Sequence, residues 1–248
     1  MRVIDVKGAR ASLAPNLSMR IALFFAIALG AAPALADDAP APSGLQIALN
    51  TGITVPFGTL MQIRDSRLGI TEAVPLQHMI TSGTPVGLEV LYGFHDSRWK
   101  YEHAESRMFV GLAFTYTPWE VYSGPSHPFV TACAGTKACK AFSLLPAAVM
   151  AVSRPLGHGA FLREDATFGP EFFSFDYPGG YQRFWGVRVT YQAGLEFRLH
   201  PQWRVGPYLA FEYAEYMALM QPGLATQSIM GNSFTLAWSL GFRGSFDL

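Results

Sequence analysis

The sequence predicts an all-β fold, an eight-stranded antiparallel up-and-down β-barrel that crosses a membrane. Three observations indicate it. Apolar residues recur at every second position through most of the chain, which is the period of a strand with one apolar face. Several of these segments are much longer than the strands of about 5–6 residues usual in globular proteins. An apolar segment near the beginning has the features of an export signal.

The composition fits a barrel in a membrane and argues against a nucleic-acid-binding protein. Of the 248 residues, 50% are hydrophobic and 15% are charged, whereas globular domains average about 25% charged residues. Lys plus Arg and Asp plus Glu both total 18, so no excess of positive charge is available to hold a polyanion. We therefore expect no nucleic-acid partner.

The export signal is predicted from a charge, an apolar run and a cleavage site in that order. Met19-Arg20 precedes the apolar residues 21–35, and Ala34-Leu35-Ala36 forms a small-x-small site. This order is typical of a secretory signal peptide, with cleavage after Ala36. The alternative, a transmembrane anchor, is disfavoured because the run is short and its end is rich in Ala and Pro.

The chain is therefore divided into three parts. Residues 1–36 are an N-terminal extension followed by the signal peptide, 37–43 a short flexible leader and 44–248 the barrel. No later stretch approaches the ~18 uninterrupted apolar residues of a membrane helix. Export without a helical span leaves the periplasm, the exterior or the outer membrane as the location.

Eight segments of the barrel region are expected to be strands. An even number is usual for bacterial outer-membrane barrels. Two segments show the pattern less clearly: 140–153 is apolar on both faces and could also be read as a helix, and 164–176 reads as a bent strand. The expected strands are 44–55, 85–94, 106–117, 140–153, 164–176, 184–199, 203–216 and 234–248.

The last strand shows the alternation that a lipid-facing wall requires. Small and polar residues occupy its odd-numbered positions, and large apolar residues occupy its even-numbered positions, interrupted by Gly244. We expect the even positions to face lipid. The predicted lipid face consists of Phe234, Leu236, Trp238, Leu240, Phe242, Phe246 and Leu248.

Connections of two sizes are expected at the two ends of the barrel. Short turns are predicted at 95–105, 154–163 and 199–204. The connections 56–84, 118–139, 177–183 and 219–231 fall at the other end, and two of them are long. Short periplasmic turns and longer external loops are the pattern of outer-membrane barrels.

Six charged residues fall on the predicted inner face, where a small barrel is filled by side chains. An unpaired ion is costly in such a confined space, so we expect them to form ion pairs that fill the barrel. A narrow polar path for ions or small solutes is the alternative. The six residues are Glu89, Arg188, Glu196, Arg198, Glu212 and Arg243.

Cys133 and Cys139 are predicted to form a disulfide in an external loop. The two cysteines of an exported chain meet an oxidising compartment. A metal site would need further ligands, and two cysteines separated by five residues are a poor zinc pattern. We therefore predict no metal and no cofactor.

Catalysis is not expected, although two short motifs combine a histidine with a serine. His95-Asp96-Ser97 has a His-x-Ser spacing but falls in a predicted periplasmic turn, and Ser126-His127 is flanked by prolines. No nucleophile elbow, P-loop or dinucleotide fingerprint is present. The apolar residues of the first external loop could instead shape a barrel mouth that binds a small hydrophobic ligand. They are Leu60, Met61, Ile63, Val74, Leu76, Met79 and Ile80.

Taken together, these features give the chain a resemblance to a known protein family. The chain resembles the small eight-stranded outer-membrane β-barrels of Gram-negative bacteria, of the OmpA, OmpX and OmpW kind. It shares with predicted outer-membrane barrels a first strand ending Gly-x-x-x-Pro-x-Gly (52–58), the mid-chain cysteine pair and the ending LGFRGSFDL (240–248).

The resemblance implies a location in the outer membrane, with its lipid and lipopolysaccharide and the barrel-assembly machinery as partners. It also implies a structural or surface-interaction role. A narrow channel for small hydrophobic or ionic solutes is the alternative, a lipid A-modifying enzyme is disfavoured, and so is an exported soluble barrel that binds a hydrophobic ligand. The fold alone does not choose among them.

Overall fold

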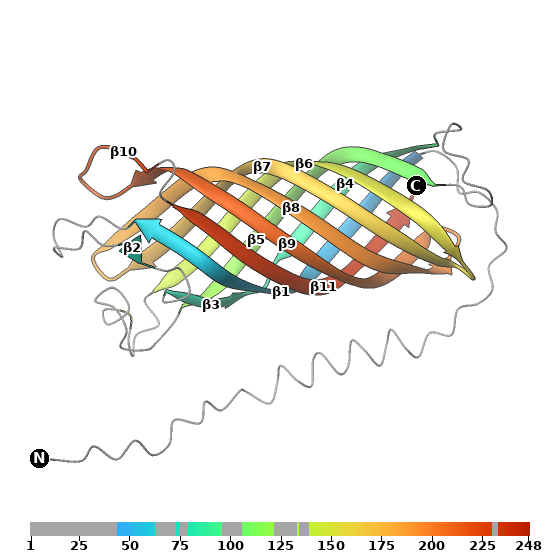
Figure 1. Cartoon of the computed structure of the whole chain (residues 1–248), viewed down its shortest axis with the longest axis horizontal. Helices are drawn as coiled ribbons and strands as arrows, with labels where there is room; N and C mark the ends of the chain where they lie inside the picture. Colours follow the sequence, from blue (N-terminus) through green and yellow to red (C-terminus); the bar gives the residue numbers. More distant parts are fainter. Residues whose placement is uncertain are drawn as a thin grey trace, which may run out of the picture. The chain divides into compact units, whose positions relative to one another are not determined.

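The computed structural model describes residues 44–62, 73–74, 79–95, 106–121, 133, 139–229 and 233–248. Nearly all of them lie in strands (Figure 1). The strands are β1 (Gly44–Gln62), β2 (Ala73–Val74), β3 (Ile80–Gly83), β4 (Val86–His95), β5 (Arg107–Val121), β6 (Lys140–Gly157), β7 (Ala160–Tyr177), β8 (Gly180–His200), β9 (Trp203–Met220), β10 (Gln227–Ser228) and β11 (Phe234–Asp247). The predicted signal peptide, its cleavage site after Ala36 and the leader lie outside the described residues.

The strands close into an antiparallel ring of eight, which confirms the predicted fold class. The order around the ring is β1, β4, β5, β6, β7, β8, β9 and β11, and β11 pairs again with β1. The short strand β3 continues the line of β4 beyond Thr84-Pro85 and pairs with β1 and β5. β2 and β10 add short pairings to β1 and β9.

The two ends of the barrel differ in their connections. At the terminal end, where Gly44 and Leu248 lie, β6 and β7 are joined at His158-Gly159 and β8 and β9 at Pro201-Gln202 (Figure 1). His158 and Gly159 both have positive φ, 53° and 75°, which gives this turn its sharp reversal. At the loop end, β7 turns into β8 at Pro178-Gly179.

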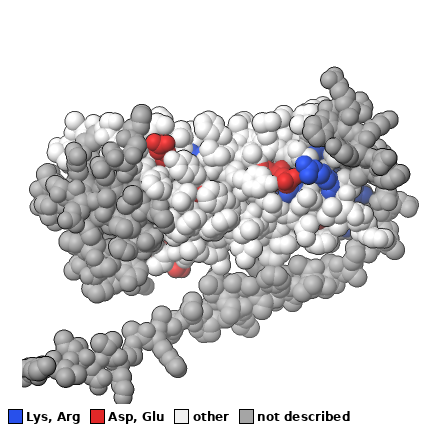
Figure 2. All heavy atoms as spheres, in the orientation of Figure 1, with Lys and Arg blue, Asp and Glu red and all other residues white. Residues whose placement is uncertain are grey.

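Side chains alternate between the two faces as the period of the sequence predicts. On β8, Trp185 and Tyr191 point outward and are 53% and 50% exposed, while Arg188 between them is buried. The last strand follows the same rule, with Trp238 and Leu240 on the outside and Ser239 buried. The described atoms on the face seen in Figure 2 are accordingly mostly uncharged, with a few acidic and basic groups. None of the described residues forms a helix long and apolar enough to cross a membrane.

The strand pairing decides the two segments whose pattern was less clear. The alternative helix over 140–153 is wrong, because this segment is a strand paired along its length with β5. The segment 164–176 is part of the strand β7, as predicted, and pairs with β8 without a register shift. Both patterns were obscured by the prolines Pro146 and Pro170, which lie on the outer face where the β6–β7 pairing is interrupted.

The strands also extend further into the connections than predicted. β6 and β7 continue through most of 154–163 and leave a turn of two residues. β1 runs on to Gln62 into the predicted loop 56–84, and β5 runs on to Val121. Backbone hydrogen bonding continues beyond the apolar alternation, so the alternation underestimates the length of the strands.

Alanine at Gly206 is expected to destabilise the barrel because the strands approach closely there. A Cβ atom at Gly206 would lie 1.6 Å from the carbonyl oxygen of Leu195 on β8, so β9 would have to move away. Overpacking of this kind costs about 1–3 kcal/mol. Urea unfolding in detergent micelles, followed by tryptophan fluorescence, measures the change.

Gly244→Ala is the matched control for this prediction. A Cβ atom at Gly244 meets nothing within 4 Å, so its substitution should change the free energy of unfolding by less than about 0.5 kcal/mol. Equal effects of the two substitutions would show that close packing between β8 and β9 does not limit stability.

Candidate functional site

The interior of the barrel holds a charge-balanced set of buried side chains. Among the described residues, six arginines and six carboxylates are buried. The six charges predicted to point inward are all in this set. The six that the sequence interpretation missed are Arg107, Arg163, Asp165, Glu171, Arg204 and Asp247.

The missed residues fall at strand ends or on the strand with the least regular pattern. Arg107, Arg204 and Asp247 have the inward parity of β5, β9 and β11 and lie within the predicted strands, so the alternation itself would have found them. Arg163 and Glu171 lie on β7, where adjacent aromatic residues hide the period of two.

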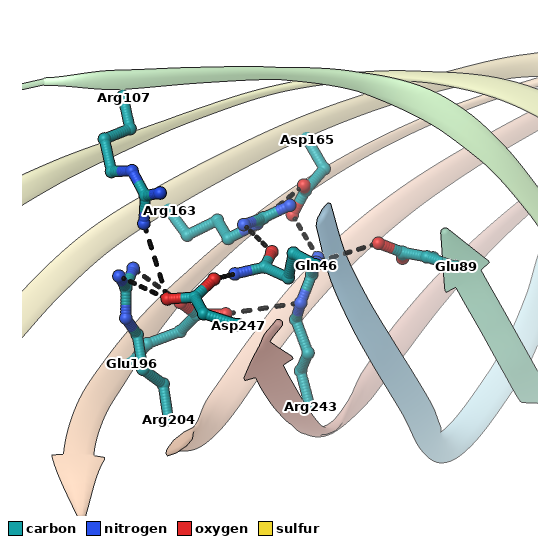
Figure 3. A network of polar contacts seen from close by, with 9 residues as sticks. All are labelled: Gln46, Glu89, Arg107, Arg163, Asp165, Glu196, Arg204, Arg243 and Asp247. Carbon is teal, nitrogen blue, oxygen red and sulfur yellow. Dashed lines mark hydrogen bonds and ion pairs between the residues drawn. The ribbon is translucent and has the colours of Figure 1, made fainter. Parts of the chain in front are cut away.

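At the terminal end, Asp247 joins strands from both sides of the barrel (Figure 3). Its carboxylate accepts a hydrogen bond of 2.8 Å from Gln46 Nε2 on β1. It also forms ion pairs of 3.4 Å with Arg107 on β5 and 3.1 Å with Arg204 on β9. The inward-pointing side chain of Asp247 thereby ties the end of β11 to these strands, and the backbone N–H of Leu248 donates to the carbonyl oxygen of Leu45.

Arg243 on β11 is the centre of the network (Figure 3). Its guanidinium lies 2.8 Å from Glu89 on β4, 3.0 Å from Asp165 on β7 and 3.2 Å from Glu196 on β8. Arg163 adds a second pair to Asp165 at 2.8 Å. One buried cation thus ties together carboxylates from three other strands, which the planar guanidinium with its five donors allows.

Inward-pointing aromatic rings support the arginines at this end. The guanidinium of Arg163 lies 4.6 Å from the ring centre of Phe109. Arg204 and Arg198 lie 4.4 and 4.9 Å from the ring centre of Phe161. Cation–π contacts at these distances are favourable for desolvated cations. Within the described part of the chain, Arg198 forms no ion pair, so this predicted interior charge is held by stacking.

A second, smaller network occupies the middle of the barrel. Arg188 pairs with Glu171 on the neighbouring strand β7 and with Glu212 on β9, the latter at 2.7 Å. Ser239 donates to Glu212 and lies 2.6 Å from the hydroxyl of Thr54. The structure therefore separates the predicted charges into two groups, with Glu89, Glu196 and Arg243 in one and Arg188 and Glu212 in the other.

The loop end is filled by apolar side chains. Phe173, Phe184 and Tyr216 have no more than 1% exposure, and their ring centres lie 5.8–6.3 Å apart. Met79 and Ile80, which were predicted to lie in the first external loop, are buried among them, and Ile80 begins β3. The described members of this loop-end cluster are Met79, Ile80, Trp119, Cys133, Ala141, Phe173, Phe175, Phe184, Ala214, Tyr216, Leu219 and Ile229.

The predicted disulfide between Cys133 and Cys139 is confirmed, with the two Cα atoms 5.6 Å apart. Cys133 is 5% exposed and packs in the loop-end cluster. Cys139 directly precedes β6. The bridge therefore connects a residue packed at the end of the barrel to the barrel wall.

A small polar cavity lies inside the barrel beside the second network. It has a volume of about 60 Å³, and residues from both networks line it, including Glu89, Arg188 and Glu212. Asn50 Oδ1 and Arg188 Nε, in two of its lining residues, have no hydrogen-bond partner among the described residues. A cavity of this size and polarity suits one or a few water molecules.

The His-x-Ser and Ser-His motifs and part of the first predicted loop fall largely outside the described residues. Asp96, Ser97, Ser126 and His127 lie outside them, and so does the side chain of His95. Of the first-loop residues, Ile63 and Leu76 lie outside as well, and Met61 pairs with Val74 where β2 extends the wall beside β1. Within the described ranges, no group of three His, Cys, Asp or Glu residues could hold a metal ion.

No protein-family model matches this chain, and no curated protein sequence matches it significantly. Solved structures of low sequence identity do resemble it. Neisserial surface protein A (NspA) is 10% identical, with 83% of this chain and 98% of that chain covered and a TM-score of 0.46.

Two proteins that are named as outer membrane proteins also resemble this chain in structure. The outer membrane protease OmpT from Escherichia coli is 6% identical, with 84% and 97% coverage and a TM-score of 0.44. The outer membrane protein OprG from Pseudomonas aeruginosa is 11% identical, with 83% and 98% coverage and a TM-score of 0.37. The pairing of its own strands shows that the chain is an eight-stranded antiparallel β-barrel.

Proposed function

We propose that this protein is an outer-membrane β-barrel with a closed interior, and that its role is structural or interactive at the cell surface. The proposal includes no catalytic activity. The observation that carries the proposal is that two kinds of buried side chains, charged and apolar, fill the interior of the barrel. The charged networks occupy the terminal end and the middle, and the loop-end cluster occupies the other end.

The outer wall supports the membrane location. The long strands β6, β7 and β9 each have 18 residues. At ~3.3 Å per residue and a tilt near 40°, such strands rise roughly 45 Å, more than the apolar band of about 25 Å needs. Leu112, Met150 and Leu240 are each at least 61% exposed on this wall, which favours lipid over water as its surroundings.

The proposed orientation places the terminal end in the periplasm and the loop end outside the cell. The signal peptide predicted before Ala36 would export the chain, and the barrel-assembly machinery would insert it. Lipopolysaccharide would then surround the loop-end half of the wall. A small hydrophobic ligand at the loop end remains part of the proposal, although Met79 and Ile80 are packed into the loop-end cluster.

The closed interior distinguishes this role from the second candidate, a narrow channel. The polar cavity is the observation in favour of a channel, but its volume of about 60 Å³ is far below that of a solute path. Ion passage would have to break pairs such as Arg243–Asp165 and displace buried aromatic rings such as Phe173.

The test is conductance in planar lipid bilayers. We expect the purified, refolded barrel to give no stable conductance steps, while a general porin reconstituted in parallel gives them. Reproducible steps that follow insertion of this protein would contradict a closed interior and support the channel.

A further inference from the structure

One ion pair on the outer wall lies apart from the others. On the described strands, most outward-facing charges lie near the loop end, where an external aqueous surface would surround them: Glu120, Lys140, Asp176, Arg183 and Glu215. Arg154 and Glu164 instead lie near the terminal end, on β6 and β7, and their side chains are 3.1 Å apart. The side chain of Arg154 is 52% exposed.

A groove in the wall begins at this ion pair. It has a volume of about 280 Å³ and crosses the outer face from β5 to β8. Met150 and Tyr191 lie on either side of Ala166 in the strand register, and the short side chain of Ala166 leaves the space between them. The side chains on its outer-face lining are Met108, Met150, Val152, Glu164, Ala166 and Tyr191.

The groove has a polar part at Glu164 and an apolar surface beside it on the outer wall. Glu164 accepts a hydrogen bond of 2.8 Å from the hydroxyl of Tyr191 and pairs with Arg154. Met150, Val152 and Ala166 offer a hydrocarbon surface beside this polar group. An amphipathic molecule with a charged head and an alkyl tail matches this arrangement.

We propose that the groove binds a glycerophospholipid whose headgroup carries both a phosphate and a primary amine. The guanidinium of Arg154 binds the phosphate, and the carboxylate of Glu164 binds the amine. One acyl chain lies over Ala166 between Met150 and Tyr191. A headgroup with both charges complements an ion pair, whereas an anionic headgroup leaves Glu164 facing like charge.

Depth in the membrane favours a phospholipid over lipid A, and this step rests on the proposed function. Glu164 is four residues from the start of β7 at Ala160, which corresponds to roughly 10 Å along the barrel axis. In the proposed orientation this depth belongs to the periplasmic leaflet, which consists of phospholipid. An ion pair facing lipid is costly there, and a bound zwitterionic headgroup lowers this cost.

Native mass spectrometry of the full barrel released from mixed micelles tests the proposal. The micelles contain equal amounts of phosphatidylethanolamine, phosphatidylglycerol and lipid A. We expect the wild-type protein to retain phosphatidylethanolamine preferentially. Arg154→Gln should reduce its retention about tenfold, as the loss of one charge-assisted hydrogen bond predicts. Ala166→Leu should reduce it to a similar extent by filling the groove.

Thr51→Leu is the matched control. Thr51 is an exposed outer-wall residue on β1, four strands around the ring from β7, and its substitution should leave retention unchanged. The shift in gel mobility on boiling verifies that each variant is folded.

Three results would overturn the proposal: equal retention by wild type and the two groove variants, an equal loss in Thr51→Leu, or a preference for lipid A. The proposed function is tested separately by membrane fractionation. A barrel that fractionates with the outer membrane but shows no selective retention refutes the lipid site alone.

Discussion

Replacing Arg243 by methionine is expected to lower the free energy of unfolding of the barrel by about 3–5 kcal/mol, because it leaves buried carboxylates without their counter-ion. Glu89, Asp165 and Glu196 all lie within 3.2 Å of this guanidinium. Asp165 keeps its pair with Arg163, but Glu89 loses its only ion pair among the described residues. Urea unfolding in detergent micelles measures the difference.

Two further variants separate the buried charge from other effects of the Arg243 substitution. Arg154→Met removes an arginine from an exposed pair and should cost less than about 1 kcal/mol. Adding Glu89→Gln to Arg243→Met should recover part of the stability, because the carboxylate without a partner is then neutral. The account of the network is wrong if Arg243→Met costs no more than Arg154→Met.

Replacing Phe173 by alanine is expected to cost about 3–5 kcal/mol, since it opens a cavity among enclosed rings. Phe173 has 0% exposure and contacts Phe184 and Tyr216, at 6.0 and 6.3 Å between ring centres. Its neighbours come from β8 and β9, so the loss should loosen the loop-end cluster across three strands. The free energy of unfolding is measured by the same urea titration.

Phe168→Ala is the control for this prediction. Phe168 lies on the same strand but faces outward with 59% exposure, so detergent or lipid fills the space that its ring leaves. Its substitution should cost clearly less than that of Phe173. Similar losses at the two positions would show that the loop-end cluster is not a packed filling.

Much of the wall could be predicted from the sequence because lipid imposes a strict alternation. Trp185 to Leu199 on β8 follow it, and so do residues 234–248, which β11 spans as far as Asp247, with Gly244 as the interruption; the structure places their large side chains outside. The inner parity of these strands also identified Arg188, Glu196 and Arg243. The disulfide followed from export and the presence of two cysteines.

The partners within the ion pairs and the loop-end cluster could not be predicted, because they depend on how the ring closes. Arg243 on β11 meets Asp165 on β7, and the two strands are not neighbours in the ring. Their contact depends on the stagger of all strands between them, which no single segment encodes. On β7, Phe172 and Phe173 are adjacent and equally apolar, so only the pairing shows which ring points inward.

The central claim, a closed barrel of eight strands in the outer membrane, is tested most directly by membrane fractionation combined with electrophoresis of boiled and unboiled samples in mild detergent. We predict that the protein is found in the outer-membrane fraction and that the unboiled sample migrates differently from the boiled one. A protein that stays in the periplasmic fraction without detergent, or whose mobility does not change on boiling, would contradict the claim.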